Sequence, residues 1–82
     1  MLKNYKDRLM RSNCAYDVES VVNELCNELC IIIELLDIRY YQKLVNRIQV
    51  NNDDLELKAY WIGELLSHLI EVSQLDFNES DE

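Results

Sequence analysis

Hydrophobic residues recur along the chain at three- and four-residue intervals, which is the spacing of α-helices. The first run predicts a short helix over residues 2–11 and comprises Leu2, Tyr5 and Leu9. A longer apolar face follows, and Asp17 has the chemistry of an N-cap just before it. This face predicts a second helix over residues 17–36 and consists of Val18, Val21, Val22, Leu25, Leu29, Ile32, Ile33 and Leu36.

The apolar face changes direction near Asp37. Projected onto one continuous helix, the next stripe falls roughly opposite the first and consists of Ile38, Tyr41, Val45 and Ile48. A break over residues 37–39 would turn this stripe, on a third helix over residues 38–50, toward the same core. An unbroken helix of about 50 Å, at 1.5 Å per residue, would instead leave the stripe free for self-association. We favour the break, because a chain this short otherwise buries little apolar surface.

The polar run NNDD, at positions 51–54, predicts the turn before the last helix. Either Asn52 or Asp53 would cap this helix, which we expect over residues 53–75 and antiparallel to the helix before it. Its predicted core stripe is Leu55, Ala59, Ile62, Leu66, Leu69 and Ile70, with Leu65 and Val72 at the edge. Residues 76–82 are acidic and polar, and we expect them to form a frayed tail.

Composition points to the same fold class. The chain of 82 residues has one glycine and no proline, whereas strand-rich folds need many turns that favour these two residues. Hydrophobic residues make up 49% of the chain, which is enough for one small core. We therefore predict a single all-α domain over residues 1–82. It would be a bundle of three to four helices, with dimerisation as one way to complete the core.

Charge limits the classes of partner. The chain has eight Lys and Arg residues and sixteen Asp and Glu residues, a formal net charge of −8. Such a surplus of acids disfavours direct binding to nucleic acid or to anionic membranes, both of which attract Lys and Arg. It favours a protein partner with a basic surface. Arg39, Lys43 and Arg47 stand out at four-residue spacing, and we expect them to pair with acids of a neighbouring helix.

The cysteines and the N-terminal sequence indicate a reduced, cytoplasmic protein. Three cysteines, an odd number, do not suit a closed disulfide framework. The N-terminal sequence MLKNYKDRLMR lacks the apolar core of a signal peptide, and the longest unbroken apolar run is far shorter than a membrane span.

The cysteines and the histidine suggest two kinds of chemistry, and the sequence favours neither. Cys26 and Cys30 are four residues apart, and together with Cys14 and His68 they would make a tetrahedral zinc set. Zinc modules usually hold one ligand pair in a tight loop, however, so we predict no metal and no cofactor. His68 is the only histidine, and no nucleophile is recognisable as its partner. We therefore predict that the protein is not an enzyme.

Large side chains lie off the core stripe of the last helix, among acids. This predicted surface comprises Leu57, Tyr60, Trp61, Glu64, His68 and Glu71. Aromatic residues among charges are typical of binding surfaces, although another helix of the bundle could cover them instead. We expect a small acidic regulator that binds a larger protein, for example an inhibitor that occludes a nucleic-acid-binding surface, as phage and mobile-element inhibitors do. The alternative is a self-assembling structural subunit.

Overall fold

The structure, a computed structural model, describes residues 2–31 and 37–81, with side chains for residues 3–31 and 37–73. These residues form four α-helices: α1 (Leu2–Met10), α2 (Ala15–Leu29), α3 (Ile38–Val50) and α4 (Leu55–Asp81). No strand occurs within the described ranges, and the predicted all-α bundle is confirmed. None of the described helices is both long enough and apolar enough to cross a membrane.

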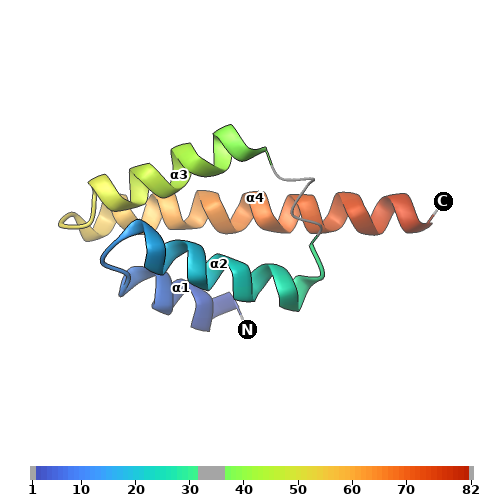
Figure 1. Ribbon diagram of the computed structural model, residues 1–82, viewed down its shortest axis with the longest axis horizontal. Coiled ribbons are helices and arrows are strands. Elements are labelled where there is room, and N and C mark those ends of the chain that lie inside the picture. Colours follow the sequence, from blue (N-terminus) through green and yellow to red (C-terminus); the bar gives the residue numbers. More distant parts are fainter. Residues whose placement is uncertain (1, 32–36, 82) are drawn as a thin grey trace.

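Helix α4 is the longest helix of the bundle (Figure 1). It runs along the longest dimension of the molecule, which measures 44 Å, and it contacts α3 on one side and α1 on the other. Helix α2 closes the bundle by contacting both α1 and α3. The short turn at residues 51–54 folds the chain back on itself, so α3 and α4 are antiparallel, as the sequence predicts.

The predicted interruption between the second and third helices is present, but α2 ends earlier than expected. Cys30 adopts the left-handed conformation, with φ 57° and ψ 37°. Its N–H donates to the carbonyl oxygen of Asn27, and the N–H of Ile31 donates to that of Cys26 at 2.9 Å. This pair of bonds is the Schellman motif that ends many helices. The prediction of a helix over residues 17–36 is therefore wrong at its C-terminal end, and residues 32–36 lie outside the described residues.

Helix α3 begins at Ile38, as predicted, because Asp37 caps it. The Asp37 carboxylate accepts hydrogen bonds from the N–H groups of Arg39 and Tyr40 at 3.1 and 3.2 Å, which is the geometry of an N-cap. The alternative of one continuous helix over residues 17–50 is excluded, because Cys30 and Asp37 both have non-helical backbone angles.

Helix α2 begins two residues before the predicted start. Its N-cap is Cys14, whose backbone is extended and whose side chain makes no capping hydrogen bond. Asp17, the expected cap, lies in the first turn instead and accepts a hydrogen bond from the N–H of Asn13 at 3.1 Å. The carboxylate near the N-terminus of α2 therefore belongs to a residue of the helix itself. The helix dipole also favours a negative charge at this position.

Helix α4 also differs from its predicted span at both ends. Asp54, rather than Asn52 or Asp53, caps it and accepts a hydrogen bond from the N–H of Leu57 at 3.2 Å. At the other end the helix continues to Asp81, whereas the sequence predicts a frayed tail after residue 75. No glycine or proline follows residue 75 to end the helix.

One hydrophobic core joins the four helices. Its buried members are Leu9, Val18, Val21, Val22, Leu25, Cys26, Ile31, Leu44, Val45, Ile48, Ile62, Leu65, Leu66, Leu69 and Val72. On α4 the buried arc is rotated from the predicted one. Leu65 and Val72, expected at the edge, are buried, whereas Leu55 is 64% exposed. The reason is that α1 and α3 cover α4 from two sides and centre its buried arc between them.

A buried lysine fastens helix α1 to α4. The side chain of Lys58 is 2% exposed, and its ammonium donates to the carbonyl oxygens of Met10 and Ser12, each at 2.8 Å. The third donor goes to Oδ1 of Asn52, in the α3–α4 turn, at 2.6 Å. Carbonyls at the end of a helix lack partners within the helix, so Lys58 supplies them from another element. Burial lowers the pKa of this ammonium.

Candidate functional site

Helix α3 divides the predicted partner surface of α4 into a covered part and an exposed part. The guanidinium carbon of Arg47 lies 5.5 Å from the centre of the Trp61 ring. The rings of Tyr40 and His68 meet edge to face, with their centroids 4.9 Å apart. Trp61 and His68 are both half-buried. Helix α3 therefore covers part of each of these two side chains.

The exposed part faces away from the bundle. Leu57 is 46% exposed and Tyr60 is 57% exposed. Their neighbours on the outward side of the helix are Glu56 and Glu71, both exposed, and Glu64, half-buried. We call this set of five residues the acidic strip: Glu56, Leu57, Tyr60, Glu64 and Glu71. Lys58 is the only Lys or Arg of α4 and is buried, so no lysine or arginine of α4 interrupts the strip.

Tyr60, the aromatic side chain of the acidic strip, contacts an aromatic neighbour that is itself half-buried. The ring of Tyr60 contacts that of Trp61 edge to face, with the centroids 5.0 Å apart. Trp61 is in turn covered by Arg47 of α3. A ring held by such contacts loses less conformational entropy when a partner binds than a free ring does. The sequence places Trp61 beside Tyr60 but gives no sign that Trp61 acts as its support.

The outward side of α3 carries the opposite charge. Arg39, Lys43 and Arg47 are all exposed, and α3 contains no acidic residue. We expected these side chains to pair with acids of a neighbouring helix, but within the described part of the chain the only ion pair joins Arg8 to Glu24. Arg47 uses its charge on the Trp61 ring instead, as a cation–π contact.

The stripe predicted to mediate self-association lies largely inside the chain. Val45 is 5% exposed and Ile48 is 1% exposed, because α3 turns both toward the common core. Tyr41 is half-buried against the same core, and burial raises its pKa to about 12. Only Ile38, which is 50% exposed, keeps a free surface. The break between α2 and α3 is the physical reason, since it allows the stripe to face its own core.

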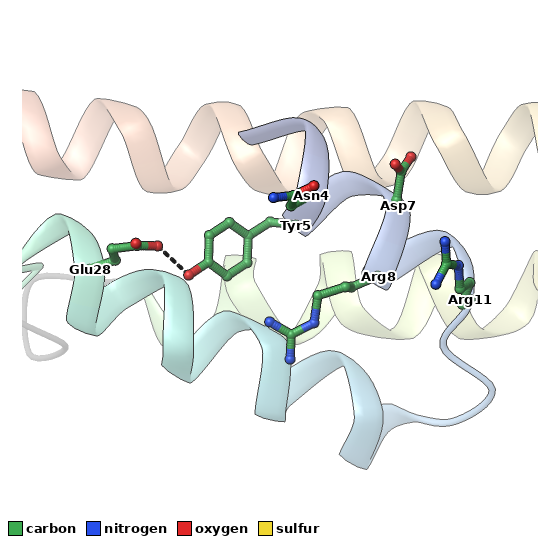
Figure 2. Close-up of a pocket in the computed structure, with 6 residues that line it drawn as sticks. All are labelled: Asn4, Tyr5, Asp7, Arg8, Arg11 and Glu28. Atoms are coloured by element: carbon green, nitrogen blue, oxygen red, sulfur yellow. Dashed lines mark hydrogen bonds between the residues drawn. The ribbon is translucent and has the colours of Figure 1, made fainter. Parts of the chain in front are cut away.

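A surface pocket between α1 and α2 is lined by Asn4, Tyr5, Asp7, Arg8, Arg11 and Glu28 (Figure 2). The Tyr5 hydroxyl donates a hydrogen bond to the Glu28 carboxylate, which raises the pKa of the phenol. Arg8 forms its ion pair with Glu24, one turn of α2 earlier. Both side chains of α1 are therefore used to bind carboxylates of α2. The pocket therefore lies where two helices meet, and the side chains that line it carry both positive and negative charges.

The three cysteines lie in different environments. Cys26 is buried, whereas Cys14 and Cys30 are exposed. Burial raises the pKa of the Cys26 thiol, which keeps it protonated as a small core residue. Across residues 3–31 and 37–73, no three side chains of His, Cys, Asp or Glu lie close enough together to hold a metal ion.

Comparison with known proteins gives no relative. No protein-family model matches the chain, and neither a curated protein nor a solved structure matches it. Any functional assignment therefore rests on the geometry and charge of this chain.

Proposed function

We propose that this chain is a non-catalytic regulator that binds a larger protein through the acidic strip of α4. The single observation that carries the proposal is the exposure of Leu57 and Tyr60 among Glu56, Glu64 and Glu71. Two large apolar side chains within a continuous negative surface are suited to a partner that offers apolar pockets among Lys and Arg residues. The partner is therefore a protein with a basic surface.

The strip would dock along a groove of the partner as one face of a single helix. From Glu56 to Glu71 it extends about 22 Å at 1.5 Å per residue. Binding energy in such interfaces concentrates in a few large side chains, with Tyr among the most frequent. Leu57 and Tyr60 would supply the anchors. The glutamates would mainly set orientation and association rate, because exposed charges contribute more to these than to affinity.

A nucleic-acid-binding surface fits the charge of the strip. Such a surface gathers Lys and Arg to contact phosphates. The carboxylates along the outward face of α4 present a row of negative charge similar to that of the phosphates. The net charge of −8 would also steer the chain toward a positive groove. Occupation of that groove by α4 would block the nucleic acid, which makes inhibition the expected outcome of binding.

Affinity capture with matched variants tests this function. The tagged chain, Leu57→Ala/Tyr60→Ala and the control Tyr16→Ala would be exposed to the same extract, with helicity checked by circular dichroism. Tyr16 is 78% exposed on α2, so the control removes an aromatic ring that is more accessible than that of Tyr60 and lies elsewhere. We expect the wild type and the control to retain the same basic protein and the double variant to lose it.

The function requires a second result on the purified partner. Adding the wild-type chain should release nucleic acid from the captured protein in a mobility-shift assay, and the double variant should not. Retention of the same proteins by all three chains would contradict the proposal. So would a captured partner whose nucleic-acid binding is unaffected.

A further inference from the structure

A second face of the molecule, which shares Leu57, Glu64 and Glu71 with the acidic strip, combines both signs of charge. It lies along the contact between α3 and α4, where Arg47 covers Trp61 and Tyr40 covers His68. Its outward side chains, which we call the α3–α4 face, are Lys43, Arg47 and Val50 of α3, and Leu57, Glu64 and Glu71 of α4. A positive helix therefore lies beside a negative one on the same side of the bundle.

These charges have not been neutralised within the chain. Helix α3 has no acidic residue, and the only Lys or Arg of α4 is the buried Lys58. In the part of the chain that the structure describes, the single ion pair is that of Arg8 with Glu24, so Lys43 and Glu64 are not joined to each other. Each row can thus accept a partner of opposite charge.

Two exposed apolar side chains lie at one end of this face. Val50, the last residue of α3, is 72% exposed, and Leu57, in the first turns of α4, is 46% exposed. Single exposed apolar residues are common on protein surfaces. Here the two stand beside the short turn that joins the helices, one on each helix.

We infer that two copies of this chain associate through the α3–α4 face, about a two-fold axis parallel to these helices. Rotation about such an axis places α3 of each copy on α4 of the other. The basic side chains of α3 in one copy then meet the acidic side chains of α4 in the other copy, and the symmetry repeats this contact. A surface made of two adjacent, oppositely charged helices is complementary to itself in this arrangement, as a closed dimer requires.

The fold fixes which residues meet. A two-fold rotation leaves every residue at its own height along the axis, so a residue of α3 meets the level of α4 that lies beside it in its own chain. Those levels are given by the contacts of Tyr40 with His68 and of Arg47 with Trp61. The antiparallel register of these two contacts, followed to within one residue, places Lys43 level with Glu64 and Val50 level with Leu57.

Both contacts form in one register. Seven residues separate Lys43 from Val50, and seven separate Leu57 from Glu64. Each interval spans about 10 Å at 1.5 Å per residue. Because α3 and α4 are antiparallel, the equal intervals allow both contacts at once, Lys43 with Glu64 of the second copy and Val50 with Leu57 of the second copy. The interface would therefore combine a pair of ionic contacts with a pair of apolar contacts at one end.

A second copy suits this face better than nucleic acid does. Phosphates attracted by Lys43 and Arg47 would also approach Glu64 and Glu71, which repel them, on a chain of net charge −8. A second copy offers the opposite charge to both rows. The dimer covers Leu57 and Glu64, so it would compete with the protein partner proposed above, but it is inferred from charge and register without that partner.

Two charge reversals test the pairing. Lys43→Glu and Glu64→Lys would be purified separately, and their masses would be measured by sedimentation equilibrium over a range of concentrations, alone and mixed. Each variant alone brings like charges together at both symmetric contacts, so dimerisation should weaken about tenfold or more. In the mixture, opposite charges face each other at both contacts, and dimers should return. The control Lys6→Glu, on α1, changes net charge equally and should dimerise like the wild type.

The outcomes separate the alternatives. Three results together support the two-fold pairing. The wild type is a dimer, each single variant has a lower mass than the wild type, and the mixture of the two variants regains the dimer mass. A wild type that stays monomeric at every concentration overturns it, as does a mixture that remains monomeric. Binding of the monomer to a DNA fragment through Lys43 would assign this face to nucleic acid and would also overturn it. The mass measurements use this chain alone. A monomeric result would therefore overturn the dimer without affecting the capture experiment that tests the proposed function.

Discussion

The ammonium of Lys58 donates a hydrogen bond to the backbone carbonyl of Ser12 at 2.8 Å, across 46 residues of chain. Its other two donors reach Met10 and Asn52. One side chain thereby joins the end of α1, the α3–α4 turn and the first turn of α4. The acidic strip begins in that same turn of α4, so the position of the proposed binding surface depends on a residue that never reaches the surface.

Replacing Lys58 with methionine should destabilise the protein by about 2–4 kcal/mol. The apolar stem of the side chain is kept, but three oxygens lose their donor, and an unsatisfied buried acceptor costs about 1–3 kcal/mol. Urea unfolding followed by circular dichroism measures the change. The control Lys6→Met removes an exposed lysine of α1 and should change stability by less than about 0.5 kcal/mol. Equal unfolding midpoints for the two variants would contradict this role of Lys58.

The phenol of Tyr41 should make stability depend on pH in the alkaline range. Burial, followed by the nearby charge of Glu19 and that of the Cys26 thiolate once alkaline pH ionises it, raises its pKa to about 12 in the folded chain, from about 10 when unfolded. The folded state thus holds the proton more tightly. Its contribution to stability is complete below the unfolded pKa and is lost as pH rises toward the folded one.

Tyr41→Phe cannot ionise and isolates this effect from other alkaline titrations. Unfolding midpoints of the variant should fall less steeply than those of the wild type as pH rises from about 10 to about 12. Tyrosinate absorbance should also lose the component that titrates last. Parallel curves for the two proteins would show that Tyr41 does not contribute.

Cys30→Gly should stabilise the protein by about 1 kcal/mol. Cys30 is the only described residue other than glycine with positive φ, and a left-handed conformation costs an ordinary residue about 1–2 kcal/mol. Glycine adopts it freely, although glycine also raises the entropy of the unfolded chain. Cys30→Ala is the matched control, because it removes the thiol and keeps the strain. An equal gain from alanine would assign the effect to the thiol.

The N-cap of α2 offers a second stabilising substitution. Cys14 has the extended backbone of an N-cap, but its side chain caps nothing. Serine at this position can accept a hydrogen bond from the first turn, which is worth about 0.5–2 kcal/mol relative to alanine. Thermal unfolding of Cys14→Ser against Cys14→Ala measures the difference. Identical midpoints would mean that the cap geometry is not accessible.

Local chemistry accounts for the elements that the sequence predicts well. The change of apolar face near Asp37 correctly indicates a separate third helix, because Asp37 is the N-cap at which α3 begins. The sequence misses the end of α2, since Cys30 is a rare residue for a left-handed position. Glycine there would have been a clear signal.

Tertiary packing accounts for the features that the sequence does not predict. Trp61 and His68 share the off-core side of α4 with Leu57, and only the placement of α3 covers the first two and leaves the third exposed. Lys58 lies four residues before Ile62, in register with the core, but a lysine in that register does not reveal which carbonyls it meets. Helix periodicity gives the face of a residue, not the neighbour that covers it.

Hydrogen exchange on the complex with the captured protein tests the central claim most directly. The chain would be compared free and bound, with exchange followed for each peptide by mass spectrometry. Binding through the acidic strip should slow exchange across residues 55–71 of α4 and leave α1 and α2 unchanged. Protection confined to α1 and α2, with residues 55–71 exchanging as in the free chain, would contradict the account.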